Sequence, residues 1–165
     1  MWIGRNRKAR VTYGFDEIAL VPGRVTINPN EIDIAWRLPR RDAEPLNFKI
    51  PILASAMDGV VDVRFAIEMS KLGGLAVLNL EGVQTRYKHP QEVLQKIVEA
   101  DKAEITHLLQ KIYQEPVQAD LIAARVREIK DNGAIAAVSS IPQRAVEFGK
   151  IAQDAGADVF VVQST

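Results

Sequence analysis

The chain has 165 residues, enough for one well-buried domain, and its 21 lysines and arginines balance its 21 aspartates and glutamates. Zero net charge argues against nucleic acid or an anionic membrane as the main partner. The lack of cysteine excludes disulfides, thiolate metal sites and cysteine catalysis within these residues, and no apolar run is long enough to span a bilayer. We therefore expect a soluble, cytoplasmic protein.

The N-terminal part of the chain is turn-rich and predicts only short strands. Residues 18–21 form an apolar run that ends at a Pro-Gly pair, and residues 24–27 could pair with it as a small hairpin. Apolar residues alternate with polar ones over 32–36, which indicates another short strand before a loop at 39–45.

A regular alternation of strands and helices begins at residue 50. Residues 50–54 and 75–78 are short apolar runs of the kind found in strands that are buried on both faces. Asp62 is placed to cap the helix between them, and the pair Gly73-Gly74 is placed to end it.

The alternation continues to the end of the chain. Residues 89–130 are helical by pattern, and residues 134–138 predict a third buried strand. Pro142 suits the start of a helix that Gly156 ends, and residues 158–162 predict a fourth buried strand.

Four parallel strands that alternate with helices fit two architectures, an open doubly wound sheet of the flavodoxin type or part of a closed (β/α)8 barrel. The pattern alone does not choose between them. A closed barrel needs about 250 residues, so this chain is too short to close one. The sequence stops just after the fourth strand, which leaves that strand's outer face uncovered and its edge unprotected. We take this as a sign that the chain is part of a larger unit.

Generic catalytic and phosphate-binding motifs are missing. The sequence contains neither a G-x-G-x-x-G run after the first strand nor a P-loop, and no pair of histidine and nucleophile can be assembled from neighbouring strand ends. His89 and His107 fall on the helical segment without other metal ligands, so we expect both on the surface.

The informative segment follows the first strand and contains Ser55, Met57 and Asp58. Barrels place their binding groups at the C-terminal ends of strands. A serine hydroxyl suits a phosphate or ribose, a methionine offers a polarizable face to a flat ring, and the aspartate could orient neighbouring groups. The alternative is a polar turn with Met57 in the core, and the residues alone favour that alternative.

Four segments carry a recognisable pattern: residues 13–22 (YGFDEIALVP), 50–60 (IPILASAMDGV), 66–79 (AIEMSKLGGLAVLN) and 155–162 (AGADVFVV). Together they resemble the signatures of the IMP dehydrogenase and GMP reductase family. The resemblance covers most of the chain except residues 83–131. This stretch is far too short for the pair of CBS regulatory modules of typical IMP dehydrogenases, and it resembles the short bacterial group that lacks them.

The resemblance implies a (β/α)8 TIM barrel. Residues 1–165 would form the N-terminal half of one catalytic barrel domain, with the first four β/α units, an N-terminal hairpin region and a helical insert at 83–131. The rest of the barrel would be a C-terminal half, and the assembly a homotetramer or octamer.

The implied activity is oxidation of IMP to XMP with NAD in guanine nucleotide biosynthesis. The catalytic cysteine of the family lies beyond the fourth strand, so this chain alone is expected to be inactive. Alternatives are a GMP reductase, which converts GMP to IMP with NADPH, and a non-catalytic relative that binds purine nucleotides.

Residue roles follow from the same resemblance. Ser55 and Met57 match positions that line the nucleotide pocket, and Asp58 matches a supporting acid. Gln163, Ser164 and Thr165 match positions beside the nicotinamide cofactor. Gln163 departs from the family, which usually has an aspartate there that hydrogen-bonds the cofactor ribose, although a neutral amide still donates and accepts. Asn79 stands where a histidine is frequent.

Overall fold

The structure is a computed structural model that describes residues 2–3, 7–8, 10–41 and 43–163. The chain divides into two units, Met1–Asp33 and Ile34–Thr165. The first unit contains short antiparallel strands and two single 3-10 turns: β1 (Trp2–Ile3), β2 (Arg7–Lys8), η1 (Phe15–Glu17) and η2 (Pro29–Glu31).

The hairpin predicted at 18–27 is wrong. The structure describes every residue of this segment and contains no strand there. The apolar side chains of the segment are exposed, as Leu20 at 99% and Val21 at 85% show. A two-stranded hairpin without a core to cover is marginally stable at best, so the local turn signal was not enough.

The second unit begins with an antiparallel hairpin of β3 (Trp36–Leu38) and β4 (Leu46–Phe48). The predicted loop at 39–45 connects the two strands. The predicted strand at 32–36 starts only at Trp36, the first residue that pairs with β4. The rings of Trp36 and Phe48 stack with centroids 4.3 Å apart, and the indole N–H donates to the Ile50 carbonyl at 2.9 Å.

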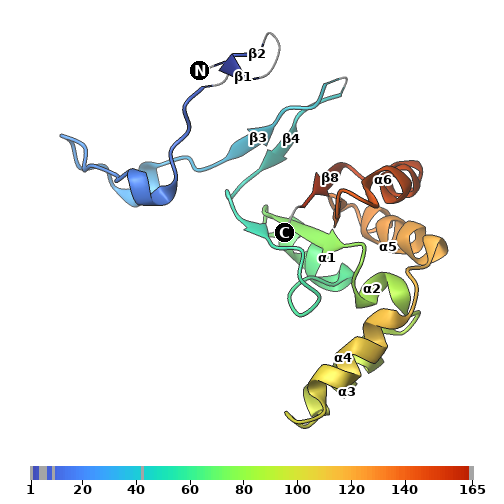
Figure 1. Ribbon diagram of the computed structural model, residues 1–165. Coiled ribbons are helices and arrows are strands. Elements are labelled where there is room, and N and C mark those ends of the chain that lie inside the picture. The colour runs from blue at the N-terminus through green and yellow to red at the C-terminus, as the bar shows by residue number, and fades with distance from the viewer. Residues whose placement is uncertain (1, 4–6, 9, 42, 164–165) are drawn as a thin grey trace. The chain divides into compact units, whose positions relative to one another are not determined.

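The remaining strands and helices alternate along the chain. Their bounds are β5 (Leu53–Ala54), α1 (Val63–Lys71), β6 (Leu75–Asn79), α2 (Val83–Arg86), α3 (Pro90–Glu99), α4 (Ile105–Gln114), α5 (Ala119–Asp131), β7 (Ala137–Ser140), α6 (Ala145–Asp154) and β8 (Val159–Val162). Three helices, α3 to α5, therefore occupy the stretch that was predicted as helical by pattern. In Figure 1, α3 and α4 project away from the sheet.

Most helix ends follow the sequence signals, but α6 begins at Ala145 and not at Pro142 as predicted, because residues 142–144 form turns. The Asp62 carboxylate caps α1 by accepting from the Phe65 N–H at 2.7 Å. Gly73, Gly133 and Gly156, which follow α1, α5 and α6, all adopt positive φ angles that L side chains rarely adopt. No helix among the described residues is long and apolar enough to cross a membrane.

The four central strands form one parallel sheet in the order β5-β6-β7-β8. A flavodoxin-like sheet would place its first strand between the second and third. The observed order has no such reversal, so the flavodoxin-like alternative does not describe these strands. Consecutive neighbours are what the wall of a (β/α) barrel requires.

The two faces of the sheet pack against different partners. One face presents Ala76, Leu78 and Val138 to a core that includes residues of α1, α5 and α6. The opposite face presents alternate residues, among them Leu75 and Val77, to the β3–β4 hairpin. We call this second face the hairpin face; the hairpin covers it near the start of the strands.

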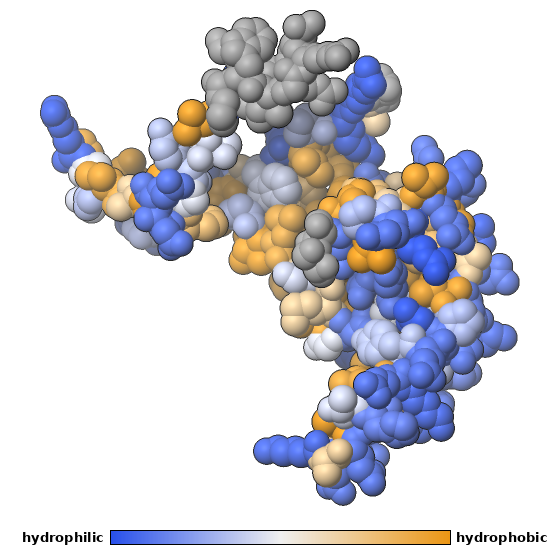
Figure 2. Space-filling view, in the orientation of Figure 1, coloured by the Kyte–Doolittle hydropathy of each residue, from blue (hydrophilic) through white to orange (hydrophobic). Residues whose placement is uncertain are grey.

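Burial on both faces is confirmed for two of the four predicted strands. β7 is buried throughout, and in β6 only Asn79 is partly exposed. The prediction is wrong for β5 and β8, where Leu53 is 53% and Val162 is 56% exposed. These strands form the edges of the sheet, and no described element covers them from outside. Figure 2 shows apolar side chains at the surface where β5 lies in Figure 1.

Candidate functional site

The loop after β5 presents the predicted substrate residues at the C-terminal edge of the sheet. Ser55 is exposed, Met57 is 55% exposed and Asp58 is half-buried. The alternative of a turn with Met57 in the core is therefore wrong. The Val60 and Val61 N–H groups both donate to the Met57 carbonyl at 2.9 Å, which closes a tight turn. Met57 thus stands on an ordered turn with its side chain open to a ligand.

Asp58 ties this loop to the loop after β6. Its Oδ2 accepts from the Val83 N–H at 2.8 Å and from the Tyr113 hydroxyl at 2.5 Å. Its Oδ1 is buried and has no hydrogen-bond partner among the described residues. Gly82 makes room for the carboxylate, since a Cβ at that position would lie 1.7 Å from Oδ1. The supporting role of Asp58 in a nucleotide site stays a prediction.

Three polar residues lie on the hairpin face at or just beyond the C-terminal ends of three neighbouring strands. Side chains alternate along a strand. Continuing the alternation from Val77, Ala137 and Val161, which belong to the hairpin-face core, leads to Asn79, Ser139 and Gln163. We call these three residues the polar layer. Asn79 pairs with Ser139 in the register, and the Gln163 N–H donates to the Ser140 carbonyl at 3.0 Å.

The polar layer retains unused hydrogen-bonding capacity. Ser139 is fully buried, and its Oγ has no partner among the described residues. Asn79 uses its Oδ1 to accept from the Glu81 N–H at 3.0 Å. Buried polar atoms are normally paired, so the unpaired Ser139 hydroxyl is an exception in this core.

Glu81 links the strand-end loops on the other side of β6. Its Oε1 accepts from the Ser140 hydroxyl at 2.7 Å and from the Ile141 N–H at 2.8 Å. Asp58 and Glu81 together join the loops that follow β5, β6 and β7. The C-terminal edge of the sheet is thereby held by two carboxylates acting through backbone N–H groups and hydroxyls.

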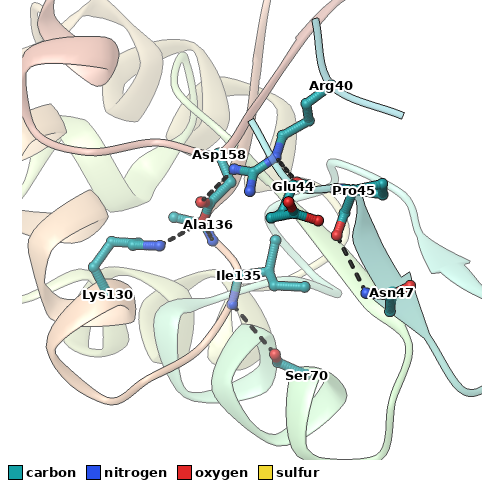
Figure 3. Close-up of polar contacts among 9 residues, drawn as sticks. All are labelled: Arg40, Glu44, Pro45, Asn47, Ser70, Lys130, Ile135, Ala136 and Asp158. Carbon is teal, nitrogen blue, oxygen red and sulfur yellow. Dashed lines mark hydrogen bonds and ion pairs between the residues drawn. The ribbon is translucent and has the colours of Figure 1, made fainter. Parts of the chain in front are cut away.

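The opposite end of the sheet carries a separate ionic contact, shown in Figure 3. Asp158, just before β8, accepts from Lys130 Nζ at 2.7 Å and from the Ala136 N–H at 2.9 Å, with Arg40 Nη1 3.7 Å away. Arg40 also donates to the Glu44 carbonyl at 2.7 Å. The cluster joins α5, the segments before β7 and β8, and the loop of the β3–β4 hairpin.

The predicted cofactor residue and the predicted substrate residues lie at opposite edges of the four-stranded sheet. Gln163 follows β8 and is half-buried, while Ser55 and Met57 follow β5. β6 and β7 lie between them, so the sheet itself does not bring these two groups into contact. Ser164 and Thr165 lie outside the described residues.

The remaining site predictions concern metal ligands. His89 and His107 are exposed, as expected. Within the described part of the chain, no group of histidine, aspartate and glutamate side chains could hold a metal ion.

Three residues of this edge were not found from the sequence. Ser139 was hidden in an unbroken run of small residues, in which the two faces of a strand look alike. Glu81 and Tyr113 carry no local motif. Tyr113 lies 55 positions from its partner Asp58, and no periodicity predicts such a contact.

Comparison with known proteins decides the family. Residues 12–165 match the model of the IMP dehydrogenase / GMP reductase domain. This chain belongs to the IMP dehydrogenase/GMP reductase family. An IMP dehydrogenase/GMP reductase-like protein from Corynebacterium glutamicum has a similar structure, with a TM-score of 0.81 and 34% identity, covering all of this chain and 44% of that one.

Similar family members include proteins without an assigned reaction. Uncharacterized oxidoreductases from Mycolicibacterium smegmatis and Mycobacterium tuberculosis are each 36% identical over 168 residues, which is 99% of this chain and 44% of each relative. An inosine-5'-monophosphate dehydrogenase from Staphylococcus haemolyticus is 30% identical over 94 residues, 56% of this chain and 18% of that protein. The chain spans less than half the length of these family members.

Proposed function

We propose that the complete protein oxidises IMP to XMP with NAD, and that this chain supplies one wall of the active site. The observation that carries the proposal is the C-terminal edge of the parallel sheet. There the exposed Met57 and the polar layer lie at strand ends, the position where barrels bind their substrates. Membership of the IMP dehydrogenase/GMP reductase family supports a purine nucleotide as the ligand.

Each substrate residue has a chemical role in this proposal. Met57 packs its thioether against the purine ring, since sulfur in an exposed, unbranched side chain makes favourable contacts with aromatic faces. Ser55 donates its hydroxyl to the phosphate or ribose. Asp58 supports the loop and does not contact the ligand itself, because its carboxylate accepts from the Val83 N–H and the Tyr113 hydroxyl.

The polar layer faces the other reactant. A half-buried Gln163 offers an amide oxygen and an amide N–H to a cofactor ribose, so the residue present fits the group, although it is neutral. When bound, NAD would supply the hydride acceptor for oxidation of the purine. Ser164 and Thr165 are proposed to complete the cofactor contact.

The nucleophile must come from outside these residues, because the chain contains no cysteine. We propose that a C-terminal half provides it and pairs with the open edges of β5 and β8. Together the two halves would form one (β/α)8 barrel domain, with residues 83–131 as a helical insert in place of CBS modules. We further propose that the complete protein assembles as a homotetramer or octamer in the cytoplasm.

The test is an assay of the complete protein with IMP and NAD, monitoring NADH by absorbance and XMP by chromatography. The expected result is equal amounts of both products. A parallel assay with GMP and NADPH tests the reductase. Turnover only in that second assay would replace the proposal by a GMP reductase, and tight IMP binding without turnover in either would replace it by a non-catalytic relative.

A further inference from the structure

Two groups of the helical insert hold Asp58 in the loop after β5, the Val83 N–H and the side chain of Tyr113. Tyr113 lies in the last turn of α4, and its hydroxyl donates to Asp58 Oδ2 at 2.5 Å. Asp58 directly follows Met57 in the loop after β5. The Val83 N–H is the other donor to the same oxygen. Of the two hydrogen bonds that hold Asp58, one therefore comes from the backbone at the start of the insert and the other from a side chain of α4 within it.

The ring of Tyr113 is itself held in place. The Arg86 guanidinium lies over it, 5.5 Å from the ring centroid, which is within the range of a cation–π interaction. Arg86 in turn donates from Nε to the Glu81 carbonyl at 3.0 Å and from Nη1 to the Glu115 carbonyl. Tyr113 is thus oriented by Arg86, which is itself bound to the loop after β6 and to the residue just after α4.

The hydroxyl of Tyr113 remains a donor at neutral pH. Partial burial raises the pKa of Tyr113 well above its ordinary value, and the hydrogen bond and charge of Asp58 add to the rise, while Arg86 opposes it. A raised pKa keeps the proton on the phenol oxygen. The contact with Asp58 is therefore a charge-assisted hydrogen bond with the tyrosine as donor.

Loss of this hydroxyl would affect the carboxylate more than the packing. Tyr113 is 40% exposed, so its ring contributes little to the core. Asp58, by contrast, already has one buried oxygen without a partner. Without the Tyr113 hydroxyl, the carboxylate keeps only the Val83 N–H as a donor, so its burial costs more free energy. We then expect the loop that carries Met57 to shift toward solvent.

We propose that Tyr113 is a positioning residue through which the insert fixes Asp58 and so sets the affinity of the Ser55–Asp58 loop for the purine nucleotide. Tyr113 touches no substrate in this proposal, which rests on the proposed function for the identity of the ligand. In this proposal the insert not only connects β6 to β7 but also supports one wall of the substrate site.

The test compares Tyr113→Phe with Tyr87→Phe in the complete protein. Tyr87 is a matched control, since its hydroxyl donates to the Ile112 carbonyl at 3.0 Å, next to Tyr113, within the same insert. We expect Tyr113→Phe to raise KM for IMP about three- to tenfold with kcat within about twofold, as for loss of a ground-state contact. Tyr87→Phe should leave KM within about twofold. Equal effects of the two variants on KM would overturn the proposal.

Coupling between the two residues gives a second readout. If Tyr113 acts through Asp58, adding Tyr113→Phe to an Asp58→Ala protein raises KM no further. Additive effects would contradict the proposal, because they would mean that Tyr113 acts by another route.

Hydrogen exchange separates this inference from the proposed function. The Val83 amide should exchange faster in Tyr113→Phe than in the wild-type protein or in Tyr87→Phe, whether or not IMP is the substrate, because its acceptor is Asp58. A wild-type protein that does not turn over or bind IMP would refute the proposed function alone. An unchanged Val83 exchange rate would refute the positioning role alone.

Discussion

At the scale of single residues, two neighbours in the loop after β5 have opposite surroundings. Met57 is more than half exposed, whereas Asp58 is held by two donors and has a buried oxygen. A substitution at Met57 should therefore change ligand binding without changing stability, and a substitution that disturbs Asp58 should change both.

Met57→Ala should raise KM for IMP about two- to tenfold in the complete protein, because the purine loses an apolar contact of about 1 kcal/mol. Stability should stay within about 0.5 kcal/mol, as expected for an exposed side chain. The measurements are steady-state kinetics and urea unfolding. Val98→Ala, at a 78% exposed position on α3, is the matched control. An unchanged KM for IMP would mean that Met57 does not contact the purine.

Gly82→Ala should destabilise the protein by about 1–3 kcal/mol, the usual range for inserting a group where no space exists. The added Cβ would lie 1.7 Å from Asp58 Oδ1, so the carboxylate must leave its position. Gly59→Ala is the control, since this glycine directly follows Asp58 in the loop after β5 and a Cβ there meets nothing within 4 Å. The unfolding midpoints in urea should differ clearly between the two variants, and similar midpoints would disprove the steric role of Gly82.

At the scale of elements, the sequence predicted best where one local signal determined the outcome. The cap at Asp62, the glycines that end helices and the buried run of β6 all follow from a few consecutive residues. Where burial depends on distant neighbours the prediction was wrong: the apolar runs of β5 and β8 look like central strands but lie at sheet edges.

The site shows the same division between local and distant information. The residues alone favoured a polar turn with Met57 in the core, and the family resemblance assigned Ser55 and Met57 to the substrate; the structure has both in the loop after β5, with Met57 exposed. Ser139 could not be separated from its neighbours in a run of small residues, and the bond between Asp58 and Tyr113 spans 55 positions. Contacts of that length depend on how elements pack, which no single segment encodes.

Asp62→Ala should cost about 1 kcal/mol, the typical value of a lost helix cap. The carboxylate caps α1 at Phe65 and also accepts from the Gln91 side chain at 2.7 Å, so one residue joins the start of α1 to α3. Asp62→Asn keeps an acceptor for the cap and should lose only a few tenths of a kcal/mol. Thermal unfolding of both variants measures the difference, and an equal loss in both would mean that charge and not capping is what matters.

At the scale of the whole molecule, the open edges of the sheet should govern the behaviour of the 165 residues on their own. Ile52 and Leu53 beside one edge and Val162 on the other are all more than half exposed. Unpaired strands with apolar side chains associate with other chains. The isolated chain should therefore elute from size-exclusion chromatography as oligomers or aggregates, and co-expression with the proposed C-terminal half should give a defined species. A stable monomer would contradict the half-barrel proposal.

The β3–β4 hairpin has a consequence for how such a barrel would be entered. Trp36 and Phe48 pack with the first residues of the central strands on the hairpin face, while the polar layer lies at the other end of the same strands. In the proposed barrel, the hairpin closes the end at which the strands begin, and only the first half contributes to this closure. Water and ligand would then enter only at the end of the strands where the polar layer lies. The second half would need to contribute only the remaining strands and helices of the barrel.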